Sequence, residues 1–129
     1  MRKFDVIVIG TGQAGPSIAA RCAKEGLKVA IIEKGKPGGT CVNYGCTPTK
    51  AMVASARAIY MAKRGSDFGV EIEGEIKVDF EKIKYRRDEI VNDSREGVKN
   101  WMEDTDNIDF IIGHARFKNN YQVEVNGEI

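Results

Sequence analysis

The feature that most constrains this chain is a glycine-rich turn at residues 10–15 (GTGQAG). It follows residues 4–9, whose β-branched apolar side chains predict a strand buried on both faces. Residues 15–24 are small and helix-compatible, and residues 28–33 form a second apolar run. A strand, a helix and a parallel strand within about 30 residues predict a right-handed βαβ unit.

Each part of this unit has a physical role if a dinucleotide binds to it. Gly10 permits the tight turn, Gly12 lets the backbone approach a pyrophosphate at the helix N-terminus, and Gly15 lets the helix pack closely on the sheet. Glu33 ends the second strand, where a carboxylate accepts hydrogen bonds from a ribose 2′-hydroxyl and disfavours an NADP-type 2′-phosphate. The pattern does not separate NAD from FAD, and a glycine turn without a ligand stays an alternative.

A second glycine-rich segment, residues 38–50 (GGTCVNYGCTPTK), carries Cys41 and Cys46 in front of a helix-forming run. A helix start lowers the pKa of a thiol, and thiols this close in sequence can cross-link if the loop folds back. Structural zinc needs four Cys or His ligands, but Cys22 and His114 lack the customary spacing, so we predict no metal site. Two unrelated buried cysteines remain an alternative, and Cys22 is interpreted as a small buried hydrophobe.

The segment from Gly38 to Lys50 resembles the redox-active disulfide signature of the pyridine nucleotide-disulfide oxidoreductases. That family includes dihydrolipoamide dehydrogenase, glutathione reductase and mercuric reductase, and residues 10–16 with residues 39–43 most resemble the mercuric-reductase-like branch. The resemblance implies an enzyme that passes electrons from NAD(P)H through FAD to a Cys41–Cys46 disulfide. The final acceptor it implies is a small-molecule disulfide or a metal ion.

The resemblance also implies roles for single residues. Cys46 would lie against the flavin ring as the charge-transfer thiolate, Cys41 would attack the substrate, and Lys50 would reach towards flavin N5, where a cation stabilises reduced flavin. Thr47 departs from the usual Val or Ile. His114 would contribute backbone contacts near the adenine rather than catalysis. The cofactor contacts implied in this way are Gly10, Gly12, Gln13, Ala14, Gly15, Glu33, Lys34, Gly39, Thr40, Cys46, Lys50, His114 and Ala115.

The remaining sequence predicts a Rossmann-like α/β fold with a long helix and a β-meander. Residues 49–64 predict a helix, and residues 79–103 predict a long one with Asp79 as its N-cap. Residues 108–112 predict a third strand of one parallel sheet. Residues 70–78 alternate like a strand, although Gly74 indicates a turn, and residues 117–125 resemble a hairpin around Asn119-Asn120.

Charge is distributed unevenly along the chain. Residues 1–64 carry 11 Lys or Arg and 3 Asp or Glu, whereas residues 65–129 carry 9 and 16. A basic half suits a phosphate-bearing cofactor, although compensating solvated faces would give the same balance. No stripe of aromatic and basic residues supports nucleic-acid binding, and no apolar run reaches the roughly 20 residues of a membrane span. We expect a cytoplasmic protein without a secretory signal.

Length bears on domain organisation, because the enzymes of this family are several times longer than 129 residues. We expect residues 1–129 to be the N-terminal portion of an FAD-binding domain, incomplete at its C-terminus. The NAD(P)H and dimerisation domains would be absent, so the chain alone would be inactive and the parent enzyme a homodimer. A nicotinamide-binding dehydrogenase domain and a non-catalytic Rossmann-like module are the competing interpretations.

Overall fold

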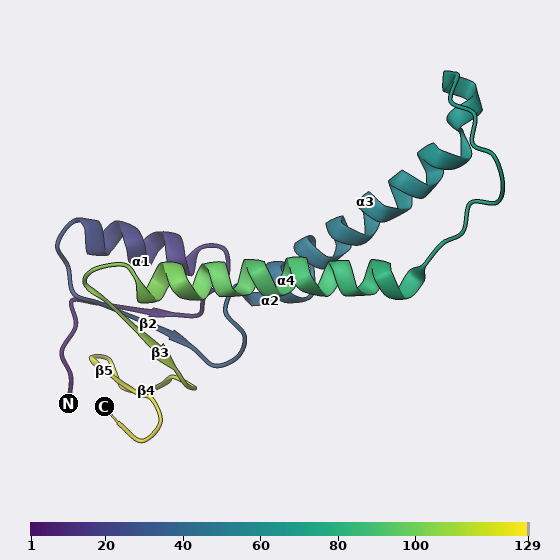
Figure 1. Cartoon of the computed structure of the whole chain (residues 1–129). Helices are drawn as coiled ribbons and strands as arrows, with labels where there is room; N and C mark the ends of the chain where they lie inside the picture. Colours follow the sequence, from purple (N-terminus) through teal and green to yellow (C-terminus); the bar gives the residue numbers. More distant parts are fainter. Residues whose placement is uncertain (129) are drawn as a thin grey trace.

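A parallel three-stranded sheet lies at one end of the molecule (Figure 1), as seen in a computed structural model that describes residues 1–128. Its strands are β1 (Val6–Ile9), β2 (Val29–Glu33) and β3 (Ile108–Ile112), in the order β1-β2-β3. Val29 is the register partner of Val6 on one side and of Ile108 on the other. The predicted βαβ unit and the third parallel strand are therefore confirmed.

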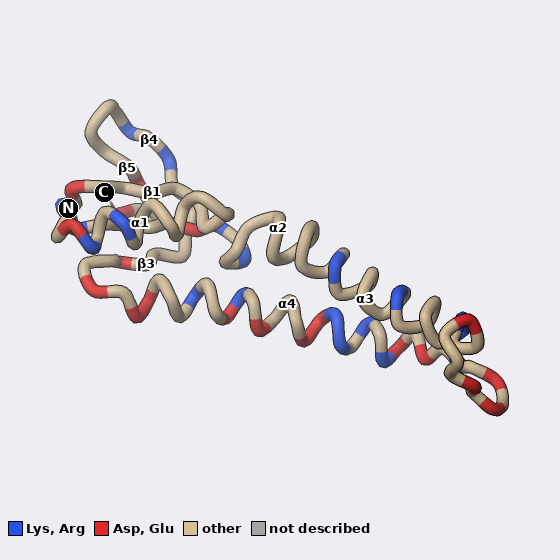
Figure 2. The backbone as a smooth tube through the Cα atoms, turned by 90° about the horizontal axis from the view of Figure 1, so that it is seen from above, with Lys and Arg blue, Asp and Glu red and all other residues tan. Residues whose placement is uncertain are grey.

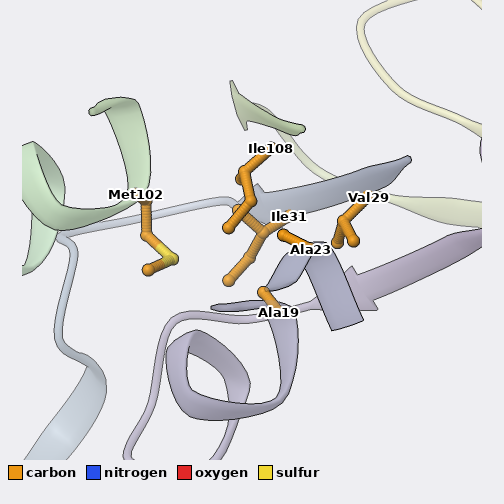
Figure 3. Close-up of a cluster of buried hydrophobic side chains, with 6 residues drawn as sticks. All are labelled: Ala19, Ala23, Val29, Ile31, Met102 and Ile108. Atoms are coloured by element: carbon orange, nitrogen blue, oxygen red, sulfur yellow. The ribbon is translucent and has the colours of Figure 1, made fainter. Parts of the chain in front are cut away.

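Two helices cover one face of this sheet: α1 (Gly15–Lys24) and the C-terminal half of α4 (Phe80–Glu103). Alanines on α1 let that helix approach β2 closely, while a methionine of α4 fills the space beside β3 (Figure 3). The buried cluster between the layers consists of Ala19, Ala23, Val29, Ile31, Met102 and Ile108.

The opposite face of the sheet is less covered than the sequence predicts. β2 is buried along its whole length, but Ile7 and Ile9 on the edge strand β1 are 41% and 50% exposed. The prediction of a first strand buried on both faces is thus wrong, because α1 and α4 cover the face of Val6 and Val8 and leave the face of Ile7 and Ile9 only partly covered. The hairpin of β4 (Arg116–Asn119) and β5 (Gln122–Glu124) lies across this face and leaves a cavity of about 370 Å³.

A long antiparallel helix pair extends away from the sheet (Figure 1). It consists of α3 (Cys46–Lys63) and α4, joined by the short 3₁₀ helix η1 (Gly65–Phe68) and an irregular segment. Within that segment residues 70–78 form no strand, and the positive φ of 90° at Gly74 marks the turn that interrupts the alternation. Asp79 caps α4 as predicted, accepting a hydrogen bond from the Lys82 backbone N–H at 2.9 Å.

Acidic residues gather at the tip of this helix pair, and both signs alternate along α4 (Figure 2). Much of the acidic excess of residues 65–129 therefore lies on the protruding helix pair and its tip. Among residues 1–128, no helix combines the length and the apolar character that crossing a membrane requires.

Candidate functional site

The glycine turn lies at the carboxyl end of β1 and leads directly into α1. Gly10 adopts a φ of 99°, and its N–H donates to the Ile32 carbonyl at 2.7 Å. A Cβ on Gly15 would lie 2.1 Å from the Gly10 carbonyl oxygen, so this position excludes every other residue. A Cβ on Gly12 would meet no other atom within 4 Å, so the space beside this residue is open. The first turn of α1 holds no acidic side chain. The turn therefore presents free helix N–H groups to an anion.

Glu33 accepts hydrogen bonds from the glycine turn across 22 residues of sequence. Its Oε2 accepts from the Thr11 backbone N–H at 2.9 Å and from Thr11 Oγ1 at 2.6 Å, and its Oε1 accepts from the Gly35 N–H at 2.8 Å. Burial raises the pKa of Glu33, but the Thr11 and Gly35 hydrogen bonds together hold that pKa below its ordinary value. Three of roughly four acceptor positions of the carboxylate are thus filled, which leaves about one for a ribose hydroxyl.

The second glycine segment packs against the first. A Cβ on Gly39 would lie 2.8 Å from the Gly12 Cα, and the Gly38 N–H donates to Thr11 Oγ1 at 3.1 Å. Gly38 and Gly39 both have positive φ angles, of 94° and 61°. Thr11, which is 1% exposed, therefore joins the turn, Glu33 and the cysteine segment. Sequence analysis missed Thr11, because a threonine inside a glycine motif carries no signal of its own.

The two cysteines lie on consecutive helices. Cys41 is half-buried on α2 (Gly39–Asn43), a short helix where the sequence predicts a loop, and Cys46 is exposed at the first position of α3. Gly45 lies against α2, since its Cβ would lie 3.2 Å from the Thr40 carbonyl oxygen, a tight contact, and 3.5 Å from the Cys41 Cα, an ordinary one. Both residues are free thiols in this structure.

The electrostatics around Cys41 differ from the expectation of a lowered thiol pKa. A hydrogen bond with the Cys46 thiol, then burial, raise the pKa of Cys41 above its ordinary value. The positive charge of Lys50, one helical turn after Cys46, opposes this shift without reversing it. The predicted lowering of a thiol pKa is therefore wrong for Cys41, because a neighbouring thiol stabilises its protonated form.

A buried amide anchors the cysteine segment to the long helix pair. Asn43, the last residue of α2, donates through Nδ2 to the Pro37 carbonyl at 2.8 Å and to the Gly39 carbonyl at 2.9 Å. Its Oδ1 accepts from Arg95 Nε of α4 at 2.7 Å. Sequence analysis assigned no role to either residue, and their separation of 52 positions leaves no local pattern that would reveal the pair.

The third strand, β3, brings His114 and Ala115, which the resemblance places near the adenine, to the carboxyl-end edge of the sheet, where the glycine turn also lies. The Gly113 N–H donates to the Glu33 carbonyl at 2.8 Å, so His114 and Ala115 follow at the carboxyl ends of the parallel strands. His114 is exposed, with Arg116 Nε 3.4 Å from its Nδ1. Gln13, Ala14, Lys34 and Thr40 are exposed around this edge, which in open α/β sheets is where ligands bind.

The remaining cysteine lies away from the thiol pair. Cys22 is half-buried on α1 and packs against the hydrophobic core, so it is less buried than predicted. Within the described residues, no three His, Cys, Asp or Glu side chains converge in a way that could hold a metal ion.

A parallel sheet with a glycine-rich turn at the start of α1, joined to a close pair of thiols, defines a Rossmann-like α/β fold that carries two cysteines beside the turn. Residues 4–129 match the family model described as pyridine nucleotide-disulphide oxidoreductase, and the chain belongs to that family.

Known relatives agree with this assignment. The chain is 36% identical over 127 residues to a dihydrolipoyl dehydrogenase of Acholeplasma laidlawii, covering 98% of this chain and 38% of the relative. It is 35% identical to a mercuric reductase of Lysinibacillus sphaericus, covering 96% and 22%. The Cu(II) complex of the HOCl-induced flavoprotein disulfide reductase RclA from Escherichia coli superimposes with a TM-score of 0.80 at 35% identity, covering 98% and 25%. The chain thus spans about a fifth to two fifths of these proteins.

The comparisons confirm the predicted family and its Rossmann-like fold, and the relatives' names are those of oxidoreductases, as predicted. The flavoprotein character appears in the name of the solved structure.

Proposed function

We propose that this chain is the FAD-binding, dithiol-bearing part of a flavoprotein disulfide oxidoreductase. The observation that carries the proposal is the contact of Gly39 with Gly12, which sets the cysteine segment directly beside the dinucleotide turn. A nicotinamide-binding domain would need the turn alone. The packing of a thiol pair against that turn favours a cofactor that exchanges electrons with a dithiol.

The residues present fit FAD. The open space beside Gly12 and the uncapped start of α1 would receive the pyrophosphate, and Gly39 and Thr40 would contact the same part of the cofactor. Glu33, with about one free acceptor position, would hold a ribose hydroxyl, and the backbone of His114 and Ala115 would border the adenine. Lys34, Gln13 and Ala14 complete the rim of this edge.

Bound FAD would supply a two-electron carrier that takes a hydride from NAD(P)H and reduces a Cys41–Cys46 disulfide. The exposed Cys46 would face the flavin, and Cys41 would attack the substrate. The dithiol would pass two electrons and two protons to a substrate disulfide, or two electrons to a metal ion, and close again to the disulfide. Lys50, one turn after Cys46 on α3, would place its positive charge towards the flavin.

The domain organisation belongs to the same proposal. Residues 1–129 would form the N-terminal portion of an FAD-binding domain in a longer enzyme that is active as a homodimer. An NAD(P)H domain would lie elsewhere in that enzyme. The chain by itself would then show no NAD(P)H-driven turnover, and steady-state reduction of a disulfide by the chain with added FAD would contradict this organisation.

Equilibrium dialysis of the chain against FAD, and separately against NADH, tests the cofactor assignment. We expect FAD to bind more tightly than NADH, and Glu33→Ala to weaken FAD binding by roughly 1–3 kcal/mol, the value of a charge-assisted hydrogen bond. Glu25→Ala is the matched control, because Glu25 is an exposed acid at the end of α1 that pairs with Arg21. Tighter NADH binding would favour the nicotinamide-binding alternative.

A further inference from the structure

The Asn43 side chain holds the segment that carries Cys41. Asn43 is 7% exposed. Its side-chain Nδ2 faces the carbonyl oxygens of Lys36, Pro37 and Gly39 at 3.4, 2.8 and 2.9 Å. These carbonyls belong to the turn that enters α2 and to the first residue of α2 itself. The amide therefore closes residues 36–43 into one hydrogen-bonded unit.

Arg95 determines which way that amide points. A guanidinium is a donor without acceptor capacity, so the contact of Arg95 Nε with Asn43 at 2.7 Å requires the amide oxygen on that side. The amide NH₂ must then face the three carbonyls, which are acceptors. Arg95 is itself held on α4 by a hydrogen bond from Nη1 to Asn92 Oδ1 at 3.1 Å.

This orientation matters for the thiols because α2 cannot hold itself in place. It has five residues, far fewer than the roughly 12–15 that an isolated helix needs to be stable. Asn43 stands two positions after Cys41, whereas Cys46 belongs to the 18-residue helix α3, which packs along α4. The distance between the two thiols therefore depends on what fixes α2 to the helix pair.

We infer that Arg95 is a positioning residue of the dithiol: through Asn43 it fixes α2 against α4 and keeps Cys41 within bonding range of Cys46. The inference rests on the proposed redox role of the two cysteines. It assigns to the long helix pair a function in setting the tendency of the thiols to form a disulfide, in addition to supporting the fold.

The test is the thiol–disulfide equilibrium of the whole 129-residue chain in glutathione buffers, read by mass spectrometry of alkylated peptides. In this exchange the two thiols give two electrons and two protons to one oxidised glutathione, which leaves as two reduced glutathiones while the Cys41–Cys46 bond forms. We expect Arg95→Ala to lower the equilibrium constant for disulfide formation about tenfold, the scale of one lost hydrogen bond to a charged group.

Three further variants separate positioning from general destabilisation. Arg87→Ala removes a guanidinium from the same helix, α4, but Arg87 pairs with Asp88 and not with Asn43. This variant should leave the equilibrium constant for disulfide formation unchanged. Arg95→Lys should restore most of the wild-type constant, because an ammonium also donates to the Asn43 oxygen. Asn43→Asp keeps an acceptor for Arg95 but loses the donors to the three carbonyls, so it should lower the constant as Arg95→Ala does.

Two results would overturn the inference in distinguishable ways. If the wild-type chain forms the Cys41–Cys46 disulfide and Arg95→Ala leaves its constant unchanged, or Arg87→Ala lowers it equally, the positioning role is wrong while the proposed function stands. If the wild-type chain forms no such disulfide under any glutathione ratio, the proposed function fails and takes the inference with it.

Discussion

Gly39 and Gly12 lie so close that a Cβ on Gly39 would stand 2.8 Å from the Gly12 Cα. This contact joins two motifs that are separated by a helix and a strand in the sequence, and it needs a residue without a side chain on a backbone with φ of 61°. The geometry of the site therefore depends on the absence of one methyl group.

Gly39→Ala should destabilise the chain by about 3 kcal/mol, since backbone strain at positive φ adds to overpacking against Gly12. Urea unfolding followed by circular dichroism measures this change. Gly97→Ala is the control: Gly97 lies within α4, where a Cβ meets nothing within 4 Å, and should stabilise the chain by about 0.5–1 kcal/mol. Equal effects of the two substitutions would show that the contact is not tight.

The Thr11–Glu33 pair should make the stability of the chain depend on acid. The folded-state pKa of Glu33 is lowered, so its carboxylate contributes stability that is present above the pKa of the unfolded chain. That contribution is lost as the pH falls through the folded-state pKa.

Glu33→Gln should therefore lower the free energy of unfolding at neutral pH and flatten its decrease below about pH 4. Urea titrations at a series of pH values measure both effects. Glu25→Gln, an exposed acid on α1, should leave the profile close to that of the wild type. A profile for Glu33→Gln that runs parallel to the wild type would show that Glu33 does not titrate with folding.

The Gly12–Gly39 contact and the Thr11–Glu33 pair also show what could and could not be predicted from the sequence. The buried strand β2, the helix α1 and the Asp79 cap follow from local patterns of apolar residues and capping groups. The exposure of Ile7 and Ile9 on β1 does not, because an apolar run does not reveal whether both faces of its strand are covered. The Thr11, Asn43 and Arg95 contacts bridge 22 to 52 positions, and no periodicity encodes such pairs.

The short helix α2 was missed for a related reason. It begins at a glycine with positive φ, and its five residues hold no repeating apolar stripe that would predict a helix. Its position comes from the Arg95–Asn43 hydrogen bond and from packing on Gly12, both of which are tertiary contacts. The local sequence pattern therefore does not reveal the framework that holds the two glycine segments together.

The thiol pair gives a prediction about reactivity. Because the Cys46 thiol is the largest cause of the raised pKa of Cys41, Cys46→Ala should lower that pKa. The pH profile of Cys41 alkylation by iodoacetamide, followed by peptide mass spectrometry, should then shift to lower pH. Lys50→Met should shift it the other way, since the lysine charge favours the thiolate. Cys22, in contact with the core instead, is the internal control, and an unchanged Cys41 midpoint in Cys46→Ala would refute the coupling.

The partly covered sheet face gives the last prediction, on association. β1 is an edge strand whose Ile7 side chain lines the apolar cavity of about 370 Å³ and is 41% exposed. An unpaired strand edge beside exposed apolar surface favours pairing with another chain, so the 129-residue chain should self-associate with increasing concentration. Ile7→Lys places a charge on this edge and should shift sedimentation towards the monomer. Ile18→Lys is the matched control, because Ile18 is 52% exposed on α1, which packs on the other face of the sheet from Ile7. A wild-type chain that stays monomeric at every concentration, with or without FAD, would show that the β4–β5 hairpin covers the sheet well enough to protect its edge.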